Sequence, residues 1–309
     1  MTRVAAVDCG TNSIRLLIHD SVAGEICREM TIVRLGEGVD ATGQFSPEAI
    51  ARTRDALGAY VSRMADEGVE AVRMVATSAT RDAANRDDFF DMTRELLGRI
   101  QPGAVAEVIS GEEEAALSFR GATSDIDASR APFCVIDLGG GSTEFIIEGE
   151  GAYSTRMGCV RITERFMRTD PPTAEETAAA REYIDAQIAD ALTAVPLSHA
   201  ATFVGCAGTF TTLSALAQGL DSYDPAAIHG SEITFDDMRA VTAALRTQTA
   251  AQRLEDPVMH PGRADVIGSG ATVVEQLMDA ITRETGGSVS SFIISEKDIL
   301  DGIVAGLLD

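Results

Sequence analysis

The amino-acid sequence predicts an α/β protein built from two domains. The chain has 309 residues, and at roughly 150 residues per domain this length suggests two. Short apolar runs typical of buried strands alternate with longer stretches of helical periodicity. After a polar stretch at residues 121–132 the pattern of the first half begins again, which indicates a domain boundary. We expect domains at residues 1–124 and 125–297, with a terminal helix at 298–309 that packs back on the first.

The first half of the chain contains strand and helix signals in alternation. We expect strands at residues 4–7, 14–18, 31–34, 69–76 and 104–109. Ser46 followed by Pro47 predicts the start of a helix that reaches about Asp66, because serine caps free N–H groups and proline fits the first turn. Two further helices are expected, one ending at Leu97 and one beginning after Ser110.

The second half continues the alternation. We expect strands at residues 133–136, 143–147, 203–206 and 292–294. Thr173 and Glu176 have the spacing of a capping box, which predicts a long alanine-rich helix to about Val195. Further helices are expected at residues 265–281 and at the end of the chain, where apolar residues recur on one helical face.

An internal repeat links the two halves. When Asp8 is aligned with Asp137, D-C-G-T-N-S-I-R-L-L-I matches D-L-G-G-G-S-T-E-F-I-I, with Asp, Gly and Ser at the same three offsets. Two such hairpins indicate duplicated domains that face one another across a cleft and offer backbone N–H groups to it. The alternative is coincidence, since β-turns favour these residue types. Gly208 and Thr209, between a strand and a helix, form a third potential anion site.

The charge of the chain excludes several functions. There are 25 Lys and Arg against 48 Asp and Glu, a net charge of −23, and the lone lysine is Lys297. A basic nucleic-acid surface and a lysine-dependent P-loop are therefore both excluded. No apolar run approaches a membrane span, and the five cysteines show no C-x-x-C pattern. We expect a cytoplasmic protein with reduced thiols, bound to neither membrane nor nucleic acid.

Three glycine turns after strands suggest a phosphate ligand, which the net charge would repel. A divalent cation bridging carboxylate and phosphate oxygens resolves this conflict, helped by arginines such as Arg15 and Arg81. Asp8 and Asp137, each at a strand tip, are the expected Mg²⁺ anchors, with Glu144 on the second hairpin. The alternative is that both aspartates only hydrogen-bond their own turns.

The run Glu112-Glu113-Glu114 begins a helix, where carboxylates are favoured by the helix dipole. A carboxylate delivered there by a strand could also orient and deprotonate a water for attack on phosphorus. Covalent mechanisms have less support, because Ser13 and Ser142 lack a nearby histidine in sequence and no G-x-S-x-G motif exists. Direct attack by water is therefore favoured.

Four motifs occur in order: D-C-G-T-N-S-I-R-L at residues 8–16, T-S-A-T-R-D-A-A-N at 77–85, V-I-S-G-E-E-E-A at 108–115 and V-I-D-L-G-G-G-S-T-E at 135–144. With these motifs the chain resembles the exopolyphosphatase and guanosine pentaphosphate phosphohydrolase (Ppx/GppA) family of the actin-like ATPase superfamily. The resemblance continues through G-C-A-G-T-F-T-T-L and R-A-D-V-I-G-S-G-A and covers essentially the whole chain. It implies two ribonuclease-H-like domains with the active site in the cleft between them.

The resemblance also implies roles for particular residues. Glu114 is the implied catalytic base, and Asp137, Glu144 and Asp8 are the implied ligands of Mg²⁺ or Mn²⁺. The implied phosphate-binding residues are Gly10, Thr11, Asn12, Ser13, Arg15, Arg81, Gly139, Gly140, Gly141, Ser142, Gly208 and Thr209.

The implied reaction is hydrolysis of the terminal phosphate of inorganic polyphosphate, which releases orthophosphate. Three alternatives stay open: the same attack on guanosine pentaphosphate, an ATP-dependent kinase of small metabolites, and a non-catalytic sensor of a guanine alarmone. Relatives suggest a homodimer. Many relatives carry a further helical domain, and their G-L-R-E-G element reads D-I-L-D-G at residues 298–302. We therefore expect this short form to favour shorter polyphosphate chains.

Overall fold

The computed structural model describes residues 2–309, which form two compact units. The first holds the chain up to Gly121 together with Ile299–Asp309, and the second holds Ala122–Asp298. The predicted domain limits differ from this division by a few residues. The predicted cleft between the domains stays a prediction. Within residues 2–309, no helix is long and apolar enough to cross a bilayer.

Each unit contains one mixed β-sheet, which confirms the α/β class. The first sheet has the order β3-β2-β1-β4-β5, and the second has the order β10-β11-β9-β6-β7-β8. The strands of the first sheet are β1 Arg3–Cys9, β2 Ser13–Asp20, β3 Gly24–Ile32, β4 Ala71–Ala76 and β5 Glu107–Val108. Those of the second are β6 Phe133–Leu138, β7 Thr143–Ile147, β8 Gly151–Thr155, β9 Thr202–Cys206, β10 Glu232–Thr234 and β11 Ser291–Ile294. In both sheets three consecutive antiparallel strands are followed by two parallel ones.

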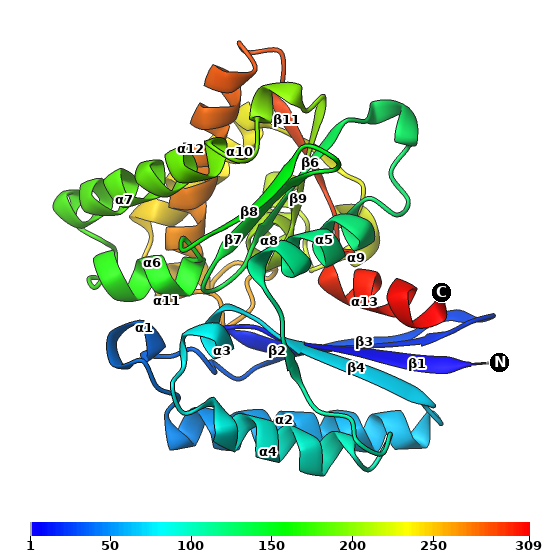
Figure 1. Cartoon of the computed structure of the whole chain (residues 1–309). Helices are drawn as coiled ribbons and strands as arrows, with labels where there is room; N and C mark the ends of the chain where they lie inside the picture. The colour runs from blue at the N-terminus through cyan, green and yellow to red at the C-terminus, as the bar shows by residue number, and fades with distance from the viewer. Residues whose placement is uncertain (1) are drawn as a thin grey trace. The chain divides into compact units, whose positions relative to one another are not determined.

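Both faces of the first sheet are covered by helices (Figure 1). The helices of this unit are α1 Val39–Thr42, α2 Pro47–Asp66, α3 Ser78–Asp82, α4 Arg86–Leu97, α5 Gly111–Ala122 and α13 Ile299–Leu308. Successive residues of β1 point to opposite faces, so Ala5 and Val7 pack with α2 and α4 while Val4 and Ala6 pack with α13. This double burial explains the continuous apolar run in β1.

The second unit has a single core around its sheet. Its helices are α6 Cys159–Phe166, α7 Ala174–Leu192, α8 Ala207–Ala217, α9 Pro225–Ile228, α10 Phe235–Thr247, α11 Ala250–Arg253 and α12 Ile267–Glu284, with 3-10 turns at Ala128–Arg130 and Leu197–His199. Phe145, Phe203, Phe210 and Phe292 are fully buried. Rings of this size dominate the apolar area that a core removes from water.

The predicted caps are confirmed, and two predicted strands are wrong in their limits. Ser46 Oγ accepts the N–H of Ala49 at 3.1 Å, and Thr173 and Glu176 form both bonds of the capping box. The strand predicted at residues 104–109 is the two-residue β5. The strand predicted at residues 31–34 is instead β3, Gly24–Ile32. Its polar, half-exposed edge gives no apolar run, and Arg34 leaves the extended conformation with a φ of 50°. Strand β8 was not predicted, because it is also partly exposed and gives no apolar run.

The terminal helix α13 packs against α5 through a glycine. A Cβ at Gly302 would lie 2.1 Å from the carbonyl oxygen of Leu117, whereas a Cβ at Gly306 would meet its nearest atom at 3.8 Å. We expect Gly302→Ala to lower the free energy of unfolding by about 1–3 kcal/mol through overpacking. Gly306→Ala, on the same helix, should be neutral or stabilise by about 0.5–1 kcal/mol. Urea denaturation of both variants measures the difference, and equal effects would contradict the close packing.

Candidate active site

Two hairpin turns have the same geometry, one in each unit. The Gly10 N–H donates to the carbonyl of Ser13 at 3.0 Å between β1 and β2. The Gly139 N–H donates to the carbonyl of Ser142 at 3.0 Å between β6 and β7. The matching bond at matching offsets agrees with the predicted internal repeat.

The two hairpins differ in the residue opposite the aspartate. Asp8 pairs in register with Arg15, and Asp137 pairs in register with Glu144. Arg15 donates to Asp8 Oδ2 from both Nε, at 3.1 Å, and Nη2, at 2.7 Å. The first hairpin thus pairs its acid with a base, and the second places two acids opposite each other on one face.

The carbonyl groups of the second glycine turn are bound by α6. Backbone N–H groups at the start of α6 donate to the carbonyls of Gly139, at 3.0 Å, and Gly140, at 2.9 and 3.1 Å. The buried Arg161 donates from Nε to the carbonyl of Gly141 at 2.8 Å. Because these carbonyl lone pairs are engaged by α6, they do not oppose an anion at the turn. Arg161 belongs to none of the motifs found in the sequence.

Of the three consecutive glutamates, Glu114 alone is buried. It is 8% exposed, whereas Glu112 and Glu113 lie on the surface and Glu113 pairs with Arg73 at 2.7 Å. Arg81 on α3 donates from Nη1 to Glu114 Oε2 at 2.7 Å and to the carbonyl of Ile109 at 3.0 Å. A buried carboxylate held by an arginine is suited to a proton-transfer role, and it differs in kind from its two neighbours.

The first turn is covered by the segment that follows β3. The N–H groups of Val33 and Arg34 donate to the carbonyl of Asn12, and that of Gly36 donates to the carbonyl of Thr11. Within residues 2–309 the buried Thr11 hydroxyl has no hydrogen-bond partner. A phosphate-binding role for Thr11 stays a prediction.

The third turn joins β9 to α8. Ala207 there has a φ of 67°, a strained conformation for a residue other than glycine, and such strain is common at functional sites. Arg263 lies against Gly208, where a Cβ would meet its guanidinium carbon at 2.4 Å. It donates weakly from Nη1 to the Gly208 carbonyl and to Thr212, each at 3.3 Å. Across residues 2–309, no carboxylate lies within ion-pair distance of Arg263.

Arg263 is a functional candidate that the sequence analysis missed. Arg263 begins the motif R-A-D-V-I-G-S-G-A, but the sequence does not show which groups surround this arginine in the fold. Only the structure shows that Arg263 lies against a predicted phosphate turn.

The residues of the second hairpin fit a magnesium ion. Asp137 is 7% exposed and Glu144 is 1% exposed, so two nearly buried carboxylates lie opposite each other. Mg²⁺ is bound through one or two carboxylates together with water and substrate phosphates, so two protein ligands suffice. In the described chain, no three His, Cys, Asp or Glu side chains form a metal-binding group. A metal role for Asp8 stays a prediction.

The buried thiols are unsuited to nucleophilic attack. Burial raises the pKa of the Cys9 and Cys134 thiols well above the ordinary value. It also raises the pKa of Cys159, beside the second turn, to about 11, although Arg263 opposes this. All three are protonated at neutral pH, and a thiol is a poor nucleophile compared with a thiolate.

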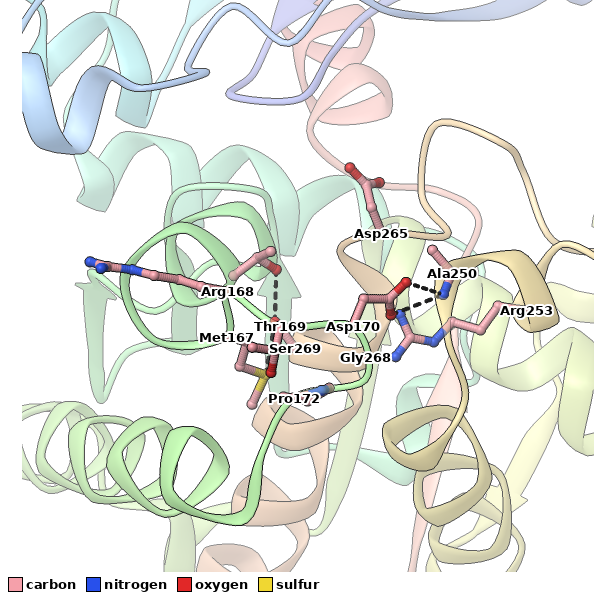
Figure 2. A pocket seen from close by; sticks show the side chains of 11 residues that line it. Met167, Arg168, Thr169, Asp170, Pro172, Ala250, Arg253, Asp265, Gly268 and Ser269 are labelled. Carbon is pink, nitrogen blue, oxygen red and sulfur yellow. Dashed lines mark hydrogen bonds between the residues drawn. The ribbon is translucent and has the colours of Figure 1, made fainter.

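A pocket of about 190 Å³ opens beside the start of α12. Figure 2 shows Asp170 in it, bound to the N–H of Ala250, with the Arg253 guanidinium nearby. Arg253 is 3% exposed and donates to the carbonyls of Leu245 and Ala264. These backbone bonds give Arg253 a structural role at the junction of α10, α11 and α12.

Comparison with known proteins identifies the family. The model of the Ppx/GppA phosphatase family matches residues 17–305, and the chain belongs to this family. It is 53% identical to exopolyphosphatase 2 of Mycobacterium tuberculosis over 99% of both chains. The crystal structure of an exopolyphosphatase-like protein, 40% identical, superposes with a TM-score of 0.93 over 99% of this chain and 98% of that one. A guanosine-5'-triphosphate,3'-diphosphate pyrophosphatase of Photobacterium profundum is 30% identical over 94% of this chain and 58% of its own length.

The second turn should depend on Gly158, at the start of α6. A Cβ there would lie 2.2 Å from the carbonyl carbon of Gly140, so turn and helix must separate in Gly158→Ala. We expect a loss of about 1–3 kcal/mol in unfolding free energy. Amide exchange at residues 139–142 should accelerate. Gly58→Ala on α2, where no atom lies within 4 Å, is the control: it should leave amide exchange at residues 139–142 unchanged and leave the unfolding free energy unchanged or raised by about 0.5–1 kcal/mol. Unchanged exchange in Gly158→Ala would contradict the contact.

Proposed function

We propose that this protein is an exopolyphosphatase that removes the terminal phosphate of inorganic polyphosphate by direct attack of water, with Mg²⁺ or Mn²⁺ as cofactor. The observation that carries the proposal is the 53% identity to an exopolyphosphatase over nearly the whole of both chains. The family assignment agrees with it. The geometry of the candidate site then suggests how each unit contributes.

In this proposal the second unit binds phosphate and metal. Asp137 and Glu144 hold the cation, which neutralises charge on the phosphate oxygens when it is bound. The N–H groups of Gly140 and Gly141 and the hydroxyl of Ser142 donate to phosphate, because α6 has already engaged the carbonyls of the turn, while the N–H of Gly139 closes the turn on the Ser142 carbonyl. Preorganised donors of this kind need no rearrangement as charge shifts during the reaction.

The third turn completes the anion-binding groups of the second unit. The start of α8 at Gly208 and Thr209 supplies N–H groups and the positive end of a helix dipole. We also assign Arg263 to phosphate, since its guanidinium lies against Gly208 in this turn. An arginine in such a position offers a planar fork of donors that matches phosphate oxygens.

The first unit supplies the proposed base. Glu114 accepts a proton from the attacking water, and Arg81 fixes the direction of its carboxylate through Oε2. Arg81 was predicted to bind phosphate directly, and that role stays a prediction beside the contact with Glu114. In the first turn Asn12, Ser13 and Arg15 are further proposed phosphate donors, whereas the N–H of Gly10, which was predicted to bind phosphate, donates to the Ser13 carbonyl and closes the turn.

Guanosine pentaphosphate is the second candidate substrate, and the relative from Photobacterium profundum favours its inclusion. Its terminal phosphoanhydride would meet the same base and the same cation. A kinase would require an acceptor hydroxyl, and a sensor would bind without turnover, so both make different predictions in one assay. Dimerisation stays a prediction.

Phosphate release from polyphosphate and from guanosine pentaphosphate tests the function. We expect release from polyphosphate in the presence of Mg²⁺ and without an acceptor, at a higher kcat/KM than from guanosine pentaphosphate. A chelator should abolish it, and added Mg²⁺ should restore it. Saturable binding without release would favour the sensor, and faster release from guanosine pentaphosphate would favour the alternative substrate.

Substitutions at Glu114 and at its neighbour Glu113 test whether Glu114 is the catalytic base. Glu114→Gln keeps the shape of the side chain and removes the proton acceptor, so kcat should fall about a hundredfold to ten-thousandfold while substrate binding persists. Glu113→Gln is the matched control on the same helical turn and should retain wild-type kcat, because Glu113 is exposed. A near-normal rate in Glu114→Gln would remove Glu114 from this role.

A further inference from the structure

Ser154 on β8 lies directly opposite Glu144 on β7 in the antiparallel register. Residues opposite each other in such a pair project from the same face of the sheet, with their Cβ atoms about 4.5–5.5 Å apart. The Ser154 hydroxyl donates to Glu144 Oε1 at 2.6 Å. Ser154 belongs to none of the motifs found in the sequence, and it has no role in the proposed reaction.

The bond joins a half-exposed hydroxyl to a carboxylate that is 1% exposed. A carboxylate at this depth loses most of its contact with water, so its oxygens depend on hydrogen-bond donors from the protein. Hydroxyl-to-carboxylate bonds of about 2.5–2.7 Å are charge-assisted and stronger than neutral ones. Since a carboxylate is planar, a donor fixed at Oε1 also sets the direction of Oε2.

The hydroxyl of the neighbouring residue on β8, Thr155, makes a different contact. Thr155 points to the opposite face and donates from Oγ1 to the carbonyl of Thr143 at 2.9 Å. It therefore joins the same two strands through the backbone. Of these two adjacent hydroxyls, only that of Ser154 contacts the carboxylate.

We propose that Ser154 is a positioning residue for the metal site, which holds the Glu144 carboxylate in the direction that a divalent cation requires. The inference rests on the proposed function, because that function makes Glu144 a metal ligand. Partners that orient a metal-ligating carboxylate commonly change metal affinity about 10- to 100-fold when removed. The effect should fall on metal affinity, not on the chemical step at saturating metal.

Mn²⁺ binding to the substrate-free protein, measured by electron paramagnetic resonance, tests the inference without turnover. We expect Ser154→Ala to raise the Kd for Mn²⁺ about 10- to 100-fold, in line with such partners. Ser154→Thr should keep the wild-type Kd, whereas Ser154→Val, nearly equal to threonine in shape but without a hydroxyl, should behave like Ser154→Ala. Thr155→Val is the matched control and should bind Mn²⁺ as wild type does.

Steady-state kinetics supply the second measurement. The Mg²⁺ concentration for half-maximal phosphate release should rise by the same factor in Ser154→Ala, with kcat recovered at saturating Mg²⁺. Equal Mn²⁺ affinity in Ser154→Thr and Ser154→Val would overturn the inference. So would a Glu144→Gln variant that binds Mn²⁺ with the same Kd as the wild-type protein. If Mn²⁺ binding depends on Ser154 but polyphosphate is not hydrolysed, the proposed function fails and this inference stands.

Discussion

The contact between the start of α6 and the glycine turn at residues 139–141 is the interaction on which the second unit's candidate site depends. A turn of glycines presents carbonyl oxygens as readily as N–H groups, and carbonyl oxygens repel phosphate. The first N–H groups of α6 and the Arg161 side chain bind these carbonyls. The helix thereby satisfies its own free donors and selects the polarity of the turn. Gly158 is required because any side chain there would separate the two.

Charge is the second constraint on this molecule. A net charge of −23 opposes any polyanionic ligand, so the attraction must be local. The two hairpins share one backbone geometry but differ in charge. Asp8 is neutralised by Arg15 within its own hairpin, whereas Asp137 lies opposite a second acid. The same backbone geometry therefore carries an acid opposite a base in one unit and an acid opposite an acid in the other.

The three consecutive glutamates at residues 112–114 have the same side chain but different surroundings. Glu112 and Glu113 extend into solvent, where a carboxylate at a helix start is ordinary surface chemistry. Glu114 is turned inward onto Arg81, which comes from a short helix more than thirty residues earlier. The strand order places β5 beside β4, so the segments after these neighbouring parallel strands come together. Two motifs that are distant in sequence thus become one buried ion pair.

The sequence by itself determined the α/β class, the strand pairs of both hairpins, the caps at Ser46 and Thr173, and the internal repeat. These features depend on the local conformational preferences of residues and on the spacing of apolar residues, and both can be recognised in the sequence. Only the tertiary structure decided the limits of β3, the presence of β8, and the roles of Ser154 and Arg263. Those depend on which strands become polar edges and on which charges find a partner across long separations, and no local pattern carries that information.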